Sequence, residues 1–498
     1  MKQSRRDFLL RSGCALGMAS LATQARHFGL MSTLAKTVET DNSFAPTDYK
    51  ALVCIFMDGG NDGNNTVIPN HSDATISNYG VYSTERLASS LAIPQANLLP
   101  IAVPRMGGLT YGLHPSFGTG ATNAGIHPLW ATGKLAVVTN CGTLVAPMTR
   151  AQYLNNSVQK PYQLYSHSDQ VAQYQTARSN IADFTGWGGK LADRMNACSN
   201  PTGLIPMITS IAGTNLFTNG QQTLPLAINN ANTALNNVLT LSGFNGNATS
   251  NARLASFNNL RSFDLESNVV KAASNVTSQA IQAQQALSTF QEVTATFPNT
   301  SIGLQLKQIA RLIKKRSELT INRQIFFARI SGFDTHNNQN NAASGQVALL
   351  QQLSQAMRAF YDEMGVQGAQ DNVIQFTVSD FSRTFTPVSS GAAAGSDHAW
   401  ANHMFVLGGS VLGGDFYGMN GSNGTPYPQL VKGAGDDADN GAGAKGRWIP
   451  TTSVEQYACT LARWYGLDPA QFSQVFPNIN NFSTSNLGFL PAASPACA

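Results

Sequence analysis

Five short apolar segments, each followed closely by a glycine or an acidic residue, constrain the fold of this chain more than any other feature. They cover residues 51–57, 134–140, 324–330, 372–378 and 404–407. Continuous apolar runs of this length are typical of strands that are buried on both faces of a parallel sheet. Residues 345–364 carry apolar side chains three or four positions apart, which predicts an amphipathic helix. This alternation predicts an α/β fold with a mostly parallel central sheet and helices on both faces.

Acidic residues follow several of these segments. Asp58 comes directly after the first, Asp334 a few residues after the third, and Asp380 shortly after the fourth. In open parallel sheets, ligands bind at the edge formed by the carboxyl ends of the strands. We therefore expect these carboxylates to lie together at one edge of the sheet.

Histidines are rare in the chain, and three of the eight occur in two short stretches near these acids. Imidazole nitrogen and carboxylate oxygen are ligands of zinc and of other divalent ions. Hydrolytic sites commonly hold one or two such ions, with a position open to water or substrate. The predicted metal ligands are Asp58, Asp334, His336, Asp380, Asp397, His398 and His403.

Three of these candidates have a structural alternative that the sequence leaves open. Asp58 precedes two glycines and could simply shape a turn. Asp380 could cap the segment that follows it. His403 opens a predicted strand and could be a core histidine.

Two further residues are candidates for catalysis. Ser166 begins a predicted helix after the second apolar segment, and a helix N-terminus stabilises the negative charge that a nucleophile or a phosphate brings. A plain N-cap is the alternative. Arg383 could clamp an anion, because guanidinium binds phosphate or sulfate oxygens in pairs, or it could form a surface ion pair. The sequence contains no GxSxG elbow, P-loop or Rossmann glycine fingerprint.

The first 37 residues match an export signal. Arg5-Arg6 followed by Phe8, Leu9 and Leu10 fits the twin-arginine pattern. The weakly apolar stretch 13–22 is too short for a stable anchor, which takes about 20 residues. We expect recognition by the twin-arginine translocase, localisation in the periplasm or outside the cell, and no stable membrane insertion.

Charge excludes one class of partner. The formal net charge is +4, but residues 1–37 hold six of the 31 basic and one of the 27 acidic residues. The remainder has 25 basic and 26 acidic residues, a net charge of −1. Because no basic patch stands out, we expect no nucleic-acid partner.

The domain organisation follows from composition. Residues 48–498 are expected to form a single domain, and residues 190–310 a helical insertion or cap, because this stretch is rich in Asn, Ala, Ser, Thr and Gln. Apart from Cys14, the five cysteines are scattered and include no CxxC pair. This pattern argues against a zinc cluster built on cysteines and allows at most two disulfides.

Several motifs resemble those of a bacterial family known as domain of unknown function 1501. They are residues 59–66, 113–115, 166–167, 332–336, 379–384, 395–398 and 405–409. The resemblance covers nearly the whole chain after the signal. The family is similar to a distant branch of the alkaline phosphatase and sulfatase superfamily, which implies an alkaline phosphatase-like, metal-binding α/β sandwich.

The resemblance also implies roles for individual residues. Asp58 matches the first metal-binding aspartate of the superfamily, and Ser166 matches its nucleophile. Asp334 and His336 match one metal-binding pair of the superfamily. Asp380 matches a further carboxylate ligand, and His398 matches a closing histidine. Phe381 stands where the phosphatases have a histidine, which implies a weak or absent second metal site.

Together these expectations describe an exported, metal-dependent hydrolase of phosphate or sulfate esters. Its substrate is a small-molecule or polymer ester, and its cofactor is a divalent ion such as zinc, calcium, magnesium or manganese. In this hypothesis Ser166 attacks the ester and Arg383 holds the anion. The alternative is a non-catalytic periplasmic binding or assembly protein on the same scaffold.

Overall fold

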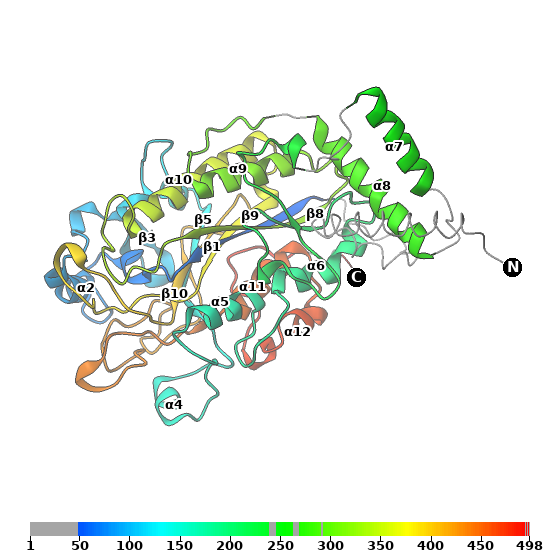
Figure 1. Cartoon of the computed structure of the whole chain (residues 1–498). Helices are drawn as coiled ribbons and strands as arrows, with labels where there is room; N and C mark the ends of the chain where they lie inside the picture. Colours follow the sequence, from blue (N-terminus) through cyan, green and yellow to red (C-terminus); the bar gives the residue numbers. More distant parts are fainter. Residues whose placement is uncertain are drawn as a thin grey trace.

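Two β-sheets form the framework of the chain, as the computed structural model shows (Figure 1). The structure describes residues 48–238, 246–261, 268–289, 292–493, 495 and 497. The twin-arginine segment lies outside these residues. No helix in the described ranges is both long and apolar enough to cross a membrane.

The large sheet contains nine strands in the order β11-β5-β10-β9-β1-β8-β6-β7, with β12 beside β5. At its centre, β1 (Lys50–Asp58) lies between β8 (Arg323–Ser331) and β9 (Val373–Ser379), parallel to both. Next to β9, β10 (Asn402–Leu407) is antiparallel to both β9 and β5 (Leu135–Gly142). The short strands are β6 (Ile208–Ser210), β7 (Leu226–Ala227), β11 (Phe416–Tyr417) and β12 (Thr452–Ser453). The prediction of an α/β fold with a mostly parallel sheet is confirmed. The antiparallel direction of β10 was not predicted, because an apolar run does not indicate strand direction.

Side chains that alternate along β1 separate two cores. Val53 and Ile55 pack on one face, beneath α9 (Ser301–Lys314) and α10 (Gln346–Val366). Cys54 and Phe56 pack on the other face. That face is covered by α5 (His167–Thr176), α6 (Trp187–Ser199), α11 (Val454–Tyr465) and α12 (Phe472–Val475) (Figure 1). The result is a sheet with a helical layer on each side, as expected for strands that are apolar on both faces.

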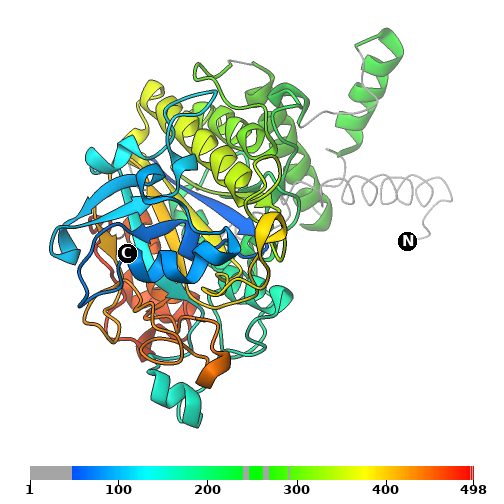
Figure 2. The ribbon, with the colours of Figure 1, turned by 90° about the vertical axis from the view of Figure 1, so that its left-hand side faces the viewer.

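A smaller antiparallel sheet has the order β2-β4-β3. Its strands are β2 (Val67–Pro69), β3 (Leu99–Val103) and β4 (Leu109–Leu113). With α2 (Tyr79–Arg86), these blue segments face the viewer in Figure 2. Two short helices, α3 (Pro128–Ala131) and α4 (Arg150–Asn155), flank β5 in the sequence.

The polar stretch 190–310 contributes to more than one part of the molecule. Its strands β6 and β7 join the large sheet, and α9 packs on that sheet. By contrast, α7 (Ala248–Arg261) and α8 (Asn268–Ser288) lie at one end, and α7 projects away from the body in both ribbon views (Figures 1 and 2). The helical insertion predicted for residues 190–310 remains a proposal, and α7 and α8 are the helices in this stretch that lie apart from the sheets.

One disulfide joins the end of α6 to the C-terminal segment. It links Cys198 and Cys497, which are 299 residues apart in the sequence. The cysteines at 54, 141 and 459 are free and buried. Burial raises the pKa of the Cys141 thiol, which makes it a small apolar core residue rather than a nucleophile.

Candidate metal centre

Three histidines and an aspartate converge at the carboxyl edge of the large sheet. Asp334 and His336 lie in the loop after β8, and His398 lies in the segment that leads into β10. The fourth residue, His167, is the first residue of α5. The loops that carry these four residues therefore meet at the edge where the sequence analysis expected carboxylates to lie.

The nitrogen and oxygen atoms of this group lie close together. The Nε2 atoms of His336 and His398 are 2.9 Å apart, and they lie 3.1 and 3.8 Å from Oδ1 of Asp334. The Nε2 atom of His167 lies 3.4 Å from the same oxygen. Zinc bonds of about 2.0–2.1 Å in a tetrahedron place neighbouring ligand atoms about 3.3–3.4 Å apart. The observed separations lie around this value.

Two overlapping triads could hold an ion among the described residues. One consists of His167, Asp334 and His398, and the other of His336, Asp397 and His398. Both depend on His398, whose Nδ1 faces the carbonyl oxygen of Tyr165 at 2.7 Å. Only Nε2 of His398 can therefore bind an ion, and one nitrogen lone pair serves one ion. The geometry accordingly supports a single ion.

Hydrogen bonds fix which imidazole nitrogens can bind an ion. Because the carbonyl oxygen of Tyr165 only accepts, Nδ1 of His398 carries the proton and Nε2 carries the lone pair. In the same way, Nδ1 of His167 donates to the Asp380 carboxylate at 2.7 Å. The Nε2 atom of His167 is buried and has no hydrogen-bond partner. A buried lone pair without a partner, opposite a carboxylate, fits a metal ligand.

Charge and burial set the protonation of the group. The hydrogen bond that His167 donates to Asp380 raises the pKa of His167 against the opposing effect of burial. Burial lowers the pKa of His398, which keeps its imidazole neutral at neutral pH. Burial alone would raise the pKa of Asp334, but the hydrogen bond and charge of Arg383 outweigh it and lower that pKa. Nε2 of His398 thus offers a neutral nitrogen beside the ionised oxygen of Asp334.

Asp380 acts on this group through His167. Its carboxylate is buried and accepts from the backbone N–H of Gly59 at 3.1 and 3.2 Å as well as from His167. A carboxylate that holds the far nitrogen of a ligating histidine orients the imidazole. Beside it, the Phe381 ring lies 4.6 Å from the ring of His167 and 4.7 Å from that of His398. Position 381 therefore supplies an apolar wall.

Arg383 does not have the free guanidinium that an anion clamp requires. Its side chain is fully buried and donates to the carbonyl oxygens of Gly59, Gly60 and Ser396. It also donates to Oδ1 of Asp334 at 2.5 Å. Arg383 therefore holds the Asp334 carboxylate in place. The sequence could not show this, because burial at this edge depends on several loops.

Gly59 allows the turn after β1 to approach Asp334. It has a φ of +111°, and a Cβ atom there would lie 2.4 Å from the backbone nitrogen of Asp334. Both observations require glycine. The glycine pair in the sequence thus permits a close backbone contact at the site.

Three residues that the sequence analysis proposed for the site are not among the four side chains that converge in the metal centre. The hydroxyl of Ser166 donates to Asp169 at 2.5 Å and makes no N-cap hydrogen bond. The Asp58 carboxylate accepts from the Ser331 hydroxyl at 2.9 Å. His403 is buried in β10 with its ring stacked on Tyr427, and burial lowers its pKa to about 3. The structural alternative therefore describes His403 better than the role of ligand.

Sequence reasoning missed His167, although it stands in the motif Ser166-His167. The available signal was a histidine at the first position of a predicted helix in the segment after β5.

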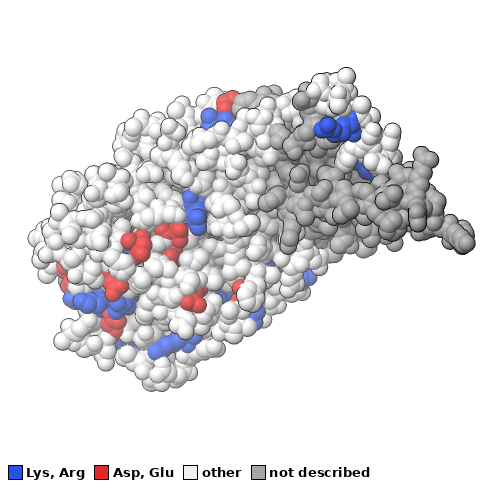
Figure 3. Space-filling model, in the orientation of Figure 1, with Lys and Arg blue, Asp and Glu red and all other residues white. Residues whose placement is uncertain are grey.

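Figure 3 shows that charged side chains are sparse on the face in view and that acidic and basic groups lie mainly in its left half. This distribution agrees with the near-neutral charge of residues 38–498.

Comparisons with known proteins give a family and distant structural likenesses. The protein-family model described as "Protein of unknown function (DUF1501)" matches residues 49–427. No curated protein matches the chain. The PsFucS1 sulfatase from Pseudoalteromonas sp. is 10% identical with a TM-score of 0.27, over 74% of this chain and 64% of its own. The structure of Ps i-CgsB in complex with k-i-k-neocarrahexaose is 7% identical with a TM-score of 0.30, over 89% of this chain and 76% of its own. The chain thus spans 64% of the length of that sulfatase, and neither likeness is close enough to carry an argument.

Proposed function

The chain belongs to the DUF1501 family of proteins of unknown function, and we propose that it is a metal-dependent hydrolase of phosphate or sulfate esters. The observation that carries this proposal is the convergence of three imidazole nitrogens and one carboxylate on a site open to solvent. Asp334 is 51% exposed and His336 is 42% exposed. Catalytic zinc sites keep one coordination position open to water or substrate, and exposed ligands give such access.

The donor set favours zinc over the other candidate ions. Calcium and magnesium prefer sites made wholly of oxygen, whereas zinc takes imidazole nitrogen together with carboxylate oxygen. We propose His167, His398 and Asp334 as ligands, with His336 beside the fourth position, which stays open to water or substrate. When bound, such an ion would act as a Lewis acid on an ester oxygen.

The protein's own groups prepare this site. Asp380 and the Tyr165 carbonyl each hold the Nδ1 proton of one histidine, so both Nε2 lone pairs keep a fixed direction. Arg383 holds the Asp334 carboxylate. Removing a residue that hydrogen-bonds to a metal ligand in this way typically lowers metal affinity or activity 10- to 100-fold.

Ser166 is the proposed nucleophile. It directly precedes His167 at the N-terminus of α5, where backbone N–H groups favour an anionic ligand. Its hydroxyl donates to the Asp169 carboxylate at 2.5 Å, so the two groups are in the hydrogen-bond contact that a nucleophile makes with its general base. Asp169 would accept the proton of Ser166 during attack.

We also propose export by the twin-arginine pathway to the periplasm or beyond. The disulfide between Cys198 and Cys497 supports this proposal, because disulfides persist in oxidising compartments. Replacing Arg5 and Arg6 by lysine should retain the protein in the cytoplasm, as cell fractionation would show. Unchanged export of that variant would contradict the proposal.

Hydrolysis of aryl phosphate and aryl sulfate esters tests the function. We expect His398→Ala to lose both metal and turnover, and Ser166→Ala to keep metal but lose turnover. His127→Ala is the matched control, because His127 bonds to Pro100 in the smaller sheet and has no part in the metal centre. Turnover by Ser166→Ala at the wild-type rate would remove Ser166 from the mechanism.

The second candidate is a non-catalytic metal-binding protein on the same scaffold. The burial of Arg383 favours it, because this arginine cannot also clamp a substrate anion. Full metal loading without turnover of either ester class would support this candidate and overturn the hydrolase.

A further inference from the structure

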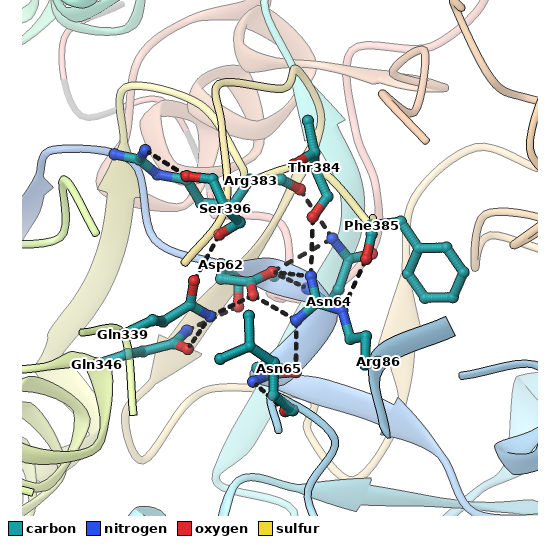
Figure 4. Close-up of polar contacts among 12 residues, drawn as sticks. Asp62, Asn64, Asn65, Arg86, Gln339, Gln346, Arg383, Thr384, Phe385 and Ser396 are labelled. Atoms are coloured by element: carbon teal, nitrogen blue, oxygen red, sulfur yellow. Dashed lines mark hydrogen bonds and ion pairs between the residues drawn. The ribbon is translucent and has the colours of Figure 1, made fainter. Parts of the chain in front are cut away.

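A second polar cluster, drawn in Figure 4, connects the loops that carry the metal centre, and its side chains are buried from solvent. This closed cluster consists of Asp62, Arg86, Gln339, Gln346 and Ser396. Its core is an ion pair between Arg86 and Asp62 at 2.6 Å, with neither side chain exposed. Asp62 comes from the motif 59–66, to which the proposed chemistry gives no role.

Every N–H group of Arg86 has a partner. The guanidinium donates to both oxygens of Asp62 and to the side-chain oxygen of Asn65. It also donates to the carbonyl oxygens of Thr384 and Phe385, at 2.9 and 3.0 Å. Arg86 thereby joins the loop after β1 to the segment after β9, which carries Asp380 and Arg383.

Gln339 extends this connection to the two loops that carry His336 and His398. Its amide nitrogen donates to Oδ2 of Asp62 at 2.6 Å, and its amide oxygen accepts from the Ser396 hydroxyl at 2.5 Å. Gln339 stands three residues after His336, and Ser396 stands two residues before His398. One buried amide thus ties both histidine loops to the Asp62–Arg86 pair.

Backbone contacts bring the same two loops together beside the ligands. The Gln339 N–H donates to the Ala394 carbonyl at 2.9 Å, and the Ser396 N–H donates to the Thr335 carbonyl at 3.1 Å. Thr335 lies between Asp334 and His336 in the sequence. A shift of one loop against the other would therefore change the distance between His336 and His398.

The energetics of a buried ion pair indicate what this cluster contributes. Removing two charges from water offsets most of their attraction, so such a pair adds little net stability. Its hydrogen bonds nevertheless allow few alternative arrangements of the loops. We propose that Asp62, Arg86 and Gln339 are positioning residues that hold the His336 and His398 loops in register for metal binding. This inference rests on the proposed metal centre for its functional meaning.

The test replaces Gln339 and leaves the ion pair in place. Gln339→Leu removes the bonds to Asp62 and Ser396 at similar side-chain volume. Gln375→Leu is the matched control, because Gln375 is a buried glutamine in β9 that bonds to the Met357 carbonyl. With zinc or cobalt(II) alone as the probe, we expect Gln339→Leu to bind at least about tenfold more weakly than Gln375→Leu. The visible spectrum of bound cobalt should also change in Gln339→Leu alone. Equal affinities in the two variants would overturn the inference.

A second measurement needs no metal. Hydrogen exchange of the metal-free protein should become faster in residues 334–346 and 391–399 of Gln339→Leu, and should not change there in Gln375→Leu. If the wild type binds no ion, the proposed function fails, and exchange still decides whether Gln339 joins the loops. Unchanged exchange in both segments would overturn the inference. Ser396→Ala, which removes one hydrogen bond, gives the same comparison if Gln339→Leu does not fold.

Discussion

The metal centre and the closed cluster lie among the same loops at the carboxyl edge of one sheet, but they use polar groups in opposite ways. In the closed cluster, all five N–H groups of Arg86 have partners and the Asp62–Arg86 pair is not exposed. In the metal centre, Nε2 of His167 is buried without a partner, and half of the Asp334 side chain is exposed. Buried polar groups in folded proteins are normally satisfied. The contrast therefore distinguishes a group that fixes structure from one that is prepared for a ligand.

The largest expected effect comes from breaking the closed cluster. Arg86→Met leaves the Asp62 carboxylate buried without its counter-charge. Removing one partner of a buried pair costs about 3–5 kcal/mol, so we expect the free energy of unfolding to decrease by this amount. Urea denaturation of the metal-free protein measures it. A loss below about 1 kcal/mol would show that the pair is not buried as described.

The metal centre should respond to pH. Metal binds the neutral imidazole, and the hydrogen bond that His167 donates to Asp380 raises the pKa of His167, so protons compete with the ion. As the pH falls below this raised pKa, apparent zinc affinity should decrease by up to about tenfold per pH unit for each proton displaced.

Competition titrations between about pH 5.5 and 8 measure this dependence. Asp380→Asn removes the carboxylate that raises the pKa of His167, so its decrease in affinity should begin at lower pH than in the wild type. An affinity that stays constant across this range would contradict the assignment of His167 as a ligand.

The smallest expected effect on stability is that of His336→Ala. The His336 side chain is 42% exposed, and its contact with Nε2 of His398 is only partly buried. We expect the free energy of unfolding of the metal-free protein to change by less than about 0.5 kcal/mol. A loss comparable to that of Arg86→Met would mean that the histidines are structural.

The sequence predicted the sheet well because its strands are apolar on both faces. The five predicted segments agree with β1, β5, β8, β9 and β10 to within about two residues, and residues 345–364 agree with α10. The direction of β10 was not predictable, because a strand that is buried on both sides has the same pattern in either orientation.

The sequence predicted part of the site. Asp334 and His336 follow β8 and His398 precedes β10, so their position at the edge could be inferred. Arg383 is different, because its burial depends on four backbone and side-chain partners from separate loops. The closed cluster was also missed, because some of its contacts join residues far apart in the sequence, such as Asp62 and Gln339, which are 277 positions apart.

Metal analysis of the purified protein tests the central claim most directly. The wild type, loaded with zinc and then dialysed, should retain about one ion per chain, as the single free nitrogen of His398 requires. His398→Ala should lose this ion while His127→Ala keeps it. A wild type that retains no ion, or a His398→Ala variant that retains as much as the wild type, would contradict the account.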